Sequence, residues 1–345
     1  MKKIFIGFWI VLLALPTFSQ KKEAATHKDL VEWMSLTEAL EKSKKEPRKI
    51  FVDIYTDWCG WCKVMSKNTF SNPQIAGYIN RYFYPVRFNA ETKDTIEFRG
   101  KKYFNSKPEG QRGTHQLTYV LTNNKPSYPT ISYLDEKGRL IQALPGYMDV
   151  NKIEPFLIYF NENAFRSAPF EAFKYNFDLT FVDSVKNKKD KIKWMSFEEV
   201  DSLNKKNPKP IIIDIYTDWS LTSKIMEATT FKNDLIANYI NEHYYPIHFD
   251  PTTNDTIVWG GRTYYHRKEY IFHDLSLLLS NKKLGIPAVI FLSKEKTPLS
   301  NVPGYRTAAG IEPVLEYFAK EIYKVKKWND FYKTFKARLS DKVKK

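Results

Sequence analysis

The chain has 345 residues and carries 54 Lys and Arg against 39 Asp and Glu, a net charge of +15 at neutral pH. A hydrophobic content of 43% is enough for ordinary globular cores and excludes a wholly disordered chain. Only two cysteines are present, which excludes a disulfide-stapled scaffold and a zinc site built from four cysteines. No apolar run reaches the ~18–20 residues that cross a bilayer, so a polytopic membrane protein is excluded as well.

The first residues have the three parts of a secretory signal peptide. Lys2 and Lys3 precede an apolar run over 4–15, and the small residues Thr17 and Ser19 stand in alternate positions before a cleavage point. We expect residues 1–19 to be removed and the mature protein to be secreted, most simply into the periplasm. A buried first helix and a retained membrane anchor are the alternatives, and after cleavage we expect no stable membrane insertion.

The positive charge raises the question of nucleic-acid binding. The lysines are spread over several segments, including 42–45, 186–193 and 324–345. No helix-turn-helix, zinc-finger or aromatic RNA-binding pattern accompanies them. We therefore expect a solvated basic surface and no nucleic-acid partner, with weak attraction to anionic lipids or cell-wall polymers as the alternative.

From residue 35 onward, helical and strand patterns alternate. In chain order we expect a helix over 35–45, a strand over 50–55, helices over about 59–70 and 73–82, a strand over 84–89, a hairpin over 96–104, a short helix over about 114–121, strands over 130–134 and 140–144, and a helix over 151–160. The near-continuous hydrophobicity of 50–55 is typical of a central parallel strand buried on both faces. This alternation indicates an α/β fold with a mixed sheet.

The same order recurs later in the chain. Asp53-Ile54-Tyr55-Thr56-Asp57-Trp58 reappears as Asp214-Ile215-Tyr216-Thr217-Asp218-Trp219, and Pro145-Gly146-Tyr147 reappears as Pro303-Gly304-Tyr305. A repeat of this length is a duplicated domain rather than a solenoid unit.

Each copy is followed by an aromatic extension with helical spacing. Its members are Phe170, Phe173 and Phe177 after the first copy and Trp328, Phe331 and Phe335 after the second. We expect each helix to pack on its own domain, with an interdomain or dimer contact as the alternative. The predicted division is a signal peptide over 1–19, a first domain over 28–177, a linker over 178–190, a second domain over 191–337 and a basic tail over 338–345.

The residues that carry chemistry are Cys59 and Cys62, at the end of the buried strand and the start of a helix. Unpaired backbone N–H groups and the positive end of the helix dipole stabilise a thiolate at that position. Cys59 can then attack a substrate disulfide, and Cys62, one turn further on, can resolve the mixed disulfide. The alternatives are a structural disulfide, which would close only a four-residue loop, a metal site, whose nearest histidine in sequence is His27, and two inert buried thiols.

The stretch over 51–63 resembles the active-site segment of the thioredoxin family. Tyr128-Pro129-Thr130 resembles that family's cis-proline loop, and Pro145-Gly146 resembles its glycine turn before the last helix. The resemblance covers most of residues 30–160 and again 191–320. It implies an α/β chain of two thioredoxin-like domains, each a mixed central sheet flanked by helices, with a C-terminal helical extension. Tryptophan between the cysteines is more similar to secreted bacterial members than to the cytosolic form.

The resemblance also implies a role for Asp53, which matches the family's buried aspartate that relays protons to the second cysteine. A carboxyl group in an apolar strand should have a raised pKa and could accept the proton of Cys62 as it attacks. Asp214 occupies the same place in the copy without thiols, so a structural role for Asp53 stays open.

A substrate peptide is expected beside the cysteines. The resemblance places Pro129 in a cis X-Pro bond, which turns the backbone groups of Tyr128 toward Cys59 and toward an extended substrate. Trp58, Trp61 and Tyr128 would form an aromatic rim for that peptide.

The second copy departs from the pattern at both cysteines. Ser220 and Ser223 replace them, so no thiol exchange is possible there, while Pro287 matches the cis-proline. We expect a degenerate domain for substrate binding, orientation or dimerisation. His115, in the segment between the repeated motifs of the first copy, is expected to be a surface or capping residue rather than a catalytic one.

These observations predict a secreted thiol–disulfide oxidoreductase that exchanges disulfides with partner proteins through Cys59 and Cys62. No cofactor and no metal are expected. The partners would be proteins with thiols or disulfides, among them a redox partner that the sequence does not identify. The alternative is a non-enzymatic client-binding or chaperone module of tandem thioredoxin folds.

Overall fold

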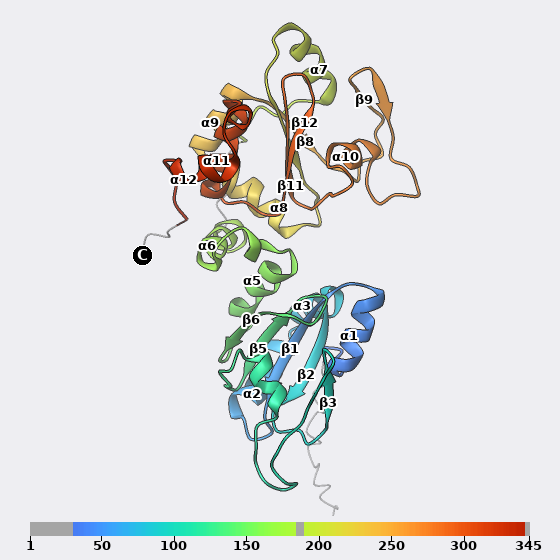
Figure 1. Ribbon diagram of the computed structural model, residues 1–345, viewed down its shortest axis with the longest axis vertical. Helices are drawn as coiled ribbons and strands as arrows, with labels where there is room; N and C mark the ends of the chain where they lie inside the picture. The colour runs from blue at the N-terminus through green and yellow to red at the C-terminus, as the bar shows by residue number, and fades with distance from the viewer. Residues whose placement is uncertain (1–29, 184–189, 342–345) are drawn as a thin grey trace, which may run out of the picture.

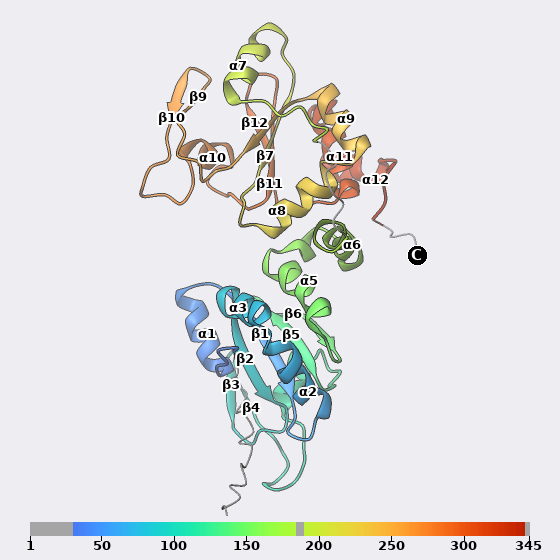
Figure 2. The same ribbon diagram turned by 180° about the vertical axis from the view of Figure 1, so that it is seen from behind.

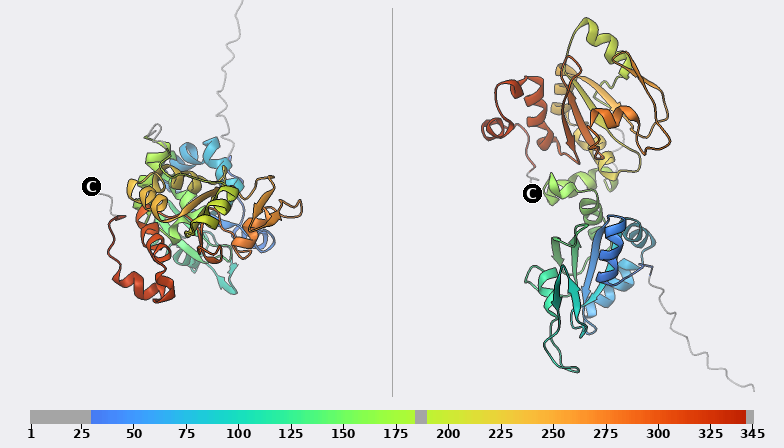
Figure 3. Two further views of the ribbon diagram at one scale, coloured as in Figure 1. Left: turned by 90° about the horizontal axis from the view of Figure 1, so that it is seen from above. Right: turned by 45° about the vertical axis from the view of Figure 1, so that its right-hand side comes forward.

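The computed structural model describes residues 30–183 and 190–341, so the predicted signal peptide lies outside the described residues. These residues form two lobes that repeat one order of elements, with helices α5 and α6 between them (Figure 1). Figure 2 shows the same arrangement from behind, and the right-hand view of Figure 3 again places these helices between the lobes. Within the described ranges, no helix combines the length and apolar character needed to span a membrane.

The first domain begins near residue 30 and ends in a helical extension. Its elements are α1 (Leu36–Lys45), β1 (Lys49–Tyr55), α2 (Gly60–Met65), α3 (Pro73–Tyr82), β2 (Phe83–Asn89), β3 (Ile96–Phe98), β4 (Lys101–Tyr103), α4 (Gln116–Leu121), β5 (Thr130–Leu134), β6 (Leu140–Pro145), α5 (Val150–Asn161) and α6 (Phe170–Phe181).

The second domain repeats this order. Its elements are α7 (Phe197–Lys206), β7 (Ile211–Ile215), α8 (Leu221–Ile225), α9 (Asp234–His243), β8 (Tyr245–Phe249), β9 (Ile257–Trp259), β10 (Arg262–Tyr264), α10 (Asp274–Leu279), β11 (Ala288–Leu292), β12 (Pro298–Pro303), α11 (Ala308–Ala319) and α12 (Trp328–Thr334).

One predicted helix differs in detail from the observed one. The helix expected over 59–70 is α for its first part and continues as a π-helical turn over Ser66–Phe70. The second domain has the same feature over Met226–Thr230, where Phe231 N donates to Met226 O at 3.0 Å. A wider turn of this kind is not visible in a pattern of apolar residues, because it changes the hydrogen-bond partner rather than the residue types.

Each domain is built on a four-stranded sheet, in the order β2-β1-β5-β6 and, in the second copy, β8-β7-β11-β12. β1 runs parallel to β2 and antiparallel to β5, and β5 pairs with β6 in antiparallel fashion. The predicted α/β class with a mixed central sheet is therefore confirmed. The hairpin of β3 and β4 turns at Arg99 and Gly100, whose φ angles of 52° and 75° suit the tight two-residue turn.

β1 is buried on both faces, as its continuous hydrophobicity predicts. Ile50, Val52 and Ile54 pack in a cluster with residues of α1 and α4. Phe51 faces the other side, where its ring meets that of Phe70, 6.0 Å away, at the end of the segment that begins with α2. Asp53 shares this second face of the strand, because side chains alternate along β1. The sheet thus places Asp53 on the side that carries the cysteine helix.

Candidate active site

Cys59 and Cys62 lie at the start of α2, one short turn after the end of β1. The turn is closed by Cys59 N, which donates to Thr56 O at 3.1 Å. Cys59 is the residue before the first helical residue, and its Sγ accepts a hydrogen bond from Cys62 N at 3.1 Å. The two sulfurs form a disulfide. After reduction, the helix end provides the backbone N–H groups that stabilise a Cys59 thiolate.

Two tryptophans flank the disulfide and remain accessible to solvent. Trp58 is 50% exposed and Trp61 is 62% exposed, although both are large apolar residues. The ring of Trp58 meets Tyr128 edge-on at 5.9 Å between centroids, which brings the Tyr128-Pro129 loop beside the cysteines. The Tyr128–Pro129 peptide bond is cis, as the resemblance implies. The structure therefore brings together the residues that the sequence assigns to a substrate rim.

Three further residues join this rim and were not predicted as part of it. The ring of Tyr147 contacts Trp61 at 5.4 Å between centroids. Trp58 Nε1 donates to Glu91 Oε2 at 2.9 Å, and the guanidinium of Arg112 lies over the Trp58 ring at 5.4 Å. Tyr147 stands in the repeated Pro-Gly-Tyr motif, so the repeat contained a signal for it. Glu91 and Arg112 lie in connecting segments, where no spacing pattern points to Trp58.

Asp53 is 2% exposed and pairs with a cation on the neighbouring strand. In the parallel register of β1 and β2, Asp53 stands opposite Arg87, and Arg87 Nε lies 3.6 Å from Asp53 Oδ2. The Arg87 guanidinium also lies 4.8 Å from the ring centroid of Tyr55. Asp53 is therefore a buried carboxyl group held against a cation of the neighbouring strand.

The second domain repeats this pair with a different cation. Asp214 stands opposite His248, whose Nδ1 lies 3.0 Å from Asp214 Oδ2. Burial raises the pKa of Asp214, while the contact with His248 lowers it. Sequence reasoning missed both partners, yet a basic residue occurs at the same distance after each aspartate, inside a buried strand. From this recurrence, both cations could have been predicted as partners of the two aspartates.

His115 is a buried residue that caps the start of α4. Its Nδ1 accepts from Leu117 N at 3.2 Å at the start of α4, and its Nε2 is hydrogen-bonded to Asp94 O at 3.0 Å. Burial lowers the pKa of His115, with backbone hydrogen bonds acting in the opposite direction. His273 caps α10 in the same way. Both histidines therefore serve the fold.

In the second domain, a side chain of the first domain lies against the residues that replace the cysteines. Ser220 precedes α8 as Cys59 precedes α2, and Ser220 and Ser223 are buried, as Cys59 and Cys62 are in the first domain. Ser220 Oγ donates to the carboxylate of Glu162, a residue of the first domain, at 2.9 Å. Among residues 30–183 and 190–341, no group of three or more His, Cys, Asp or Glu side chains is placed to bind a metal ion.

Each half of the chain matches a known protein-family model. The family model Thioredox_DsbH, described as "Protein of unknown function, DUF255", matches residues 21–157. A second model, described as "Thioredoxin-like domain", matches residues 197–319. The chain belongs to the thioredoxin superfamily, as a tandem of two such domains. The resemblance seen in the cysteine stretch and the proline loop is thereby confirmed.

The curated relatives are longer proteins. "Thiol:disulfide interchange protein DsbD" of Vibrio vulnificus (strain CMCP6) is 27% identical over 134 residues, which are 37% of this chain and 19% of the relative. "Spermatogenesis-associated protein 20" of Rattus norvegicus is 32% identical over 60 residues, 17% of this chain and 8% of the relative. The chain thus covers less than a fifth of the length of these relatives.

Solved structures of thioredoxin-superfamily proteins are also similar to part of the chain. A structure entitled "DsbH Oxidoreductase" is 24% identical, with a TM-score of 0.24, over 33% of this chain and 72% of that one. The oxidised C-terminal domain of DsbD from Neisseria meningitidis is 21% identical, with a TM-score of 0.25, over 36% of this chain and 90% of that one. The relationship to DsbD supports thiol–disulfide redox chemistry as the general kind of function.

Proposed function

We propose that this thioredoxin-superfamily protein is a secreted thiol–disulfide oxidoreductase that exchanges disulfides with partner proteins. The observation that carries the proposal is the position of Cys59 and Cys62 at the start of α2, beside two exposed tryptophans. The first sulfur stands where a helix stabilises an anion, and the second stands within bonding distance of it. The name of the DsbD relatives, thiol:disulfide interchange protein, supports the same chemistry.

The proposed reaction proceeds in two exchanges. In the reduced protein, the Cys59 thiolate attacks one sulfur of a client disulfide, forms a mixed disulfide and releases the other client sulfur as a thiolate. Cys62 then gives up its proton, attacks Cys59 Sγ and expels the second client sulfur. Two electrons pass to the client, and Cys59 and Cys62 end as a disulfide. Run in reverse, the same steps oxidise a client dithiol.

Asp53 is the proposed acceptor of the Cys62 proton. It lies on the face of β1 that carries the cysteine helix, and Arg87 Nε lies 3.6 Å from its Oδ2. Pro129 and the rings of Trp58, Trp61 and Tyr128 would hold an extended client segment across Cys59. The partners proposed are proteins that carry thiols or disulfides, including one that returns the pair to its starting redox state.

The activity is tested by insulin reduction and by reactivation of scrambled ribonuclease. Cys59→Ser should lower both rates to the uncatalysed level, and Cys62→Ser should trap a mixed disulfide with the client, because the resolving thiol is missing. Ser223→Ala, at the position equivalent to Cys62, is the matched control and should retain full activity. Equal rates for wild type and Cys59→Ser would overturn the enzyme assignment and favour a client-binding module without redox chemistry.

Secretion rests on the sequence of residues 1–19 alone. Cell fractionation followed by N-terminal sequencing tests it, with a mature N-terminus near Gln20 as the expected result. An intact Met1 on the membrane fraction would instead indicate a retained anchor.

A further inference from the structure

The two domains use the same face in different ways. In the first domain, the residues around the start of α2 are open, and Trp61 is 62% exposed. The equivalent residue of the second domain is Thr222, which is fully buried, whereas Trp219, the equivalent of Trp58, is 57% exposed. The difference between the domains therefore lies in the segment that starts at Ser220. In Figures 1 and 2, α8 faces the connecting helices α5 and α6, whereas α2 lies in the part of the lower lobe away from the upper one.

One carboxylate of the first domain covers the start of α8. Glu162 Oε2 accepts hydrogen bonds from Ser220 Oγ at 2.9 Å, Thr222 N at 3.0 Å and Thr222 Oγ1 at 2.6 Å. Glu162 Oε1 accepts from Leu221 N at 3.1 Å. Hydrogen bonds to a charged acceptor are the stronger kind, so this side chain is held firmly to the second domain.

The residues at the former cysteine segment suit this contact. Ser220 and Thr222 supply hydroxyl donors where the first domain has Cys59 and Trp61. A thiol donates a hydrogen bond only weakly, and a thiolate would be repelled by the carboxylate. An indole ring at position 222 would occupy the space in which the carboxylate lies. Ser220 and Thr222 therefore give the second domain a surface that binds Glu162, where the first domain has its cysteine site.

A second contact lies beside the first. Tyr147 of the first domain belongs to its open rim, but the equivalent Tyr305 is fully buried. Asn176 Nδ2, on α6, donates to the Tyr305 hydroxyl at 2.7 Å. The Phe173 ring, also on α6, meets Tyr305 edge-on at 5.5 Å. The extension of the first domain thus lies across two of the segments that form the client rim in the active copy.

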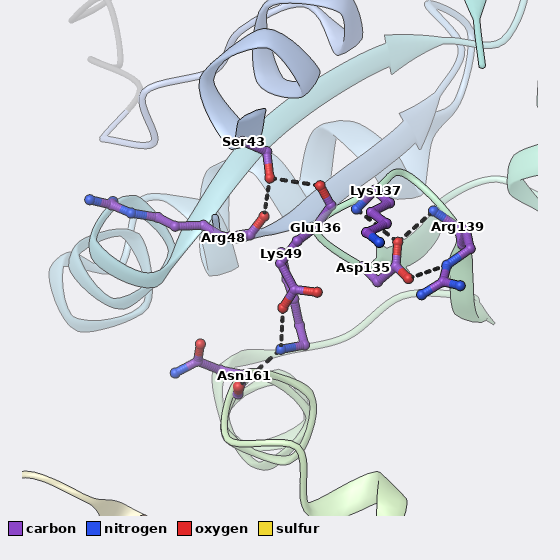
Figure 4. Close-up of polar contacts among 8 residues, drawn as sticks. All are labelled: Ser43, Arg48, Lys49, Asp135, Glu136, Lys137, Arg139 and Asn161. Atoms are coloured by element: carbon purple, nitrogen blue, oxygen red, sulfur yellow. Dashed lines mark hydrogen bonds and ion pairs between the residues drawn. The ribbon is translucent and has the colours of Figure 1, made fainter. Parts of the chain in front are cut away.

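The first domain holds Glu162 in place from its own side. Helix α5 ends at Asn161, and Asn163 has a φ of 58°, the left-handed conformation that stops a helix. Lys49 Nζ lies 3.4 Å from Asn161 O and 3.0 Å from Glu136 Oε1, and it anchors the end of α5 to the start of β1 and to the turn after β5 (Figure 4). A cation at the last carbonyl of a helix is favourable.

We propose that the cysteine-free face of the second domain is a docking site for the first domain, and that it binds Glu162 and α6 instead of a client. The two domains then move as one body, and client exchange takes place on the first domain alone. The equivalent of Glu162 at the end of α11 is Lys320, which pairs with Glu316 at 3.0 Å, so the second domain has no carboxylate at this position. The docking contact itself does not depend on the redox activity, whereas the assignment of client exchange to the first domain rests on the proposed function.

The test compares one reporter thiol at the two equivalent positions. In the full-length chain with Cys59→Ser and Cys62→Ser, Thr222→Cys places a single thiol under Glu162, and Trp61→Cys places one on the open face. We expect Thr222→Cys to react with a maleimide at least ~100-fold more slowly than Trp61→Cys, because it reacts only after the domains separate. Adding Glu162→Lys should raise the first rate at least ~10-fold and leave the second unchanged.

Equal rates for the two reporters, or no effect of Glu162→Lys on a chain with wild-type circular dichroism, would overturn the proposal. Hydrogen exchange provides a second measurement that does not depend on the reporter thiols. The amides of Leu221 and Thr222 should exchange more slowly than those of Gly60 and Trp61, and Glu162→Gln should weaken that protection. Exchange that is equally fast at both pairs would overturn the proposal too.

Discussion

Replacing Phe173 with alanine should destabilise the protein strongly, because this ring lies between the two domains. Phe173 is fully buried on α6 and contacts the rings of Tyr159 of its own domain at 5.1 Å and Tyr305 of the second domain at 5.5 Å. Burial of such a side chain contributes ~1.5–3 kcal/mol, and each aromatic pair adds ~0.5–1.5 kcal/mol. With the cavity that remains, Phe173→Ala should lower the free energy of unfolding by ~3–5 kcal/mol.

Urea unfolding followed by tryptophan fluorescence and far-ultraviolet circular dichroism measures this loss. The matched control is Tyr175→Ala, two residues along the same helix, where the ring is 51% exposed. That change should stay within ~0.5 kcal/mol. A loss below ~1 kcal/mol for Phe173→Ala would refute the packing argument, because truncation of a buried phenylalanine in a filled core costs more than that.

Three further predictions concern the sites. Burial lowers the pKa of His115 and of His273, so the folded protein binds these protons less readily than the unfolded chain. The contribution of the two neutral histidines to the free energy of unfolding should therefore be fully present above pH ~6.5 and decrease as the pH falls below it. His115→Asn, which keeps a capping acceptor, should reduce this acid-induced loss of stability in thermal melts. Asp53→Asn should slow the attack of Cys62 on a mixed disulfide by ~100-fold or more in rapid-mixing experiments, and an unchanged rate would assign Asp53 a purely structural role. Trp61→Ala should raise KM for a peptide client several-fold with little change in kcat, whereas equal losses in kcat and in kcat/KM would show that the ring acts in the transition state rather than in binding.

The local parts of the fold could be predicted because their causes are local. The apolar run over 50–55 becomes β1, and the strands over 130–134 and 140–144 become β5 and β6, since each has the residue types and the turn that its element requires. The repeat strengthened these predictions, because each predicted helix or strand had to agree with the residues of both copies. The π-helical turn after α2 was missed because it changes the hydrogen-bond partner of the backbone and not the pattern of residue types.

The aromatic helix after the first domain shows where local reasoning stops. Its spacing predicts a buried stripe, and the sequence left open whether that stripe meets its own domain or another. In the structure, Phe170 stacks on Phe156 of its own domain at 3.7 Å, while Phe173 also reaches Tyr305 of the second. An apolar stripe indicates that one face of a helix is buried, but it does not show which part of the protein packs against that face.

The sequence by itself determined the Cys59 and Cys62 pair, its place at a helix end, and the loss of that pair in the second copy, because neighbouring residues decide all three. Only the tertiary structure decided that Arg87 stands opposite Asp53 and that Glu162 lies on Ser220. Both contacts join residues far apart in the chain. A strand register or a domain interface depends on the total burial and hydrogen bonding of many groups from different segments. The residues of one segment are therefore not enough to predict it.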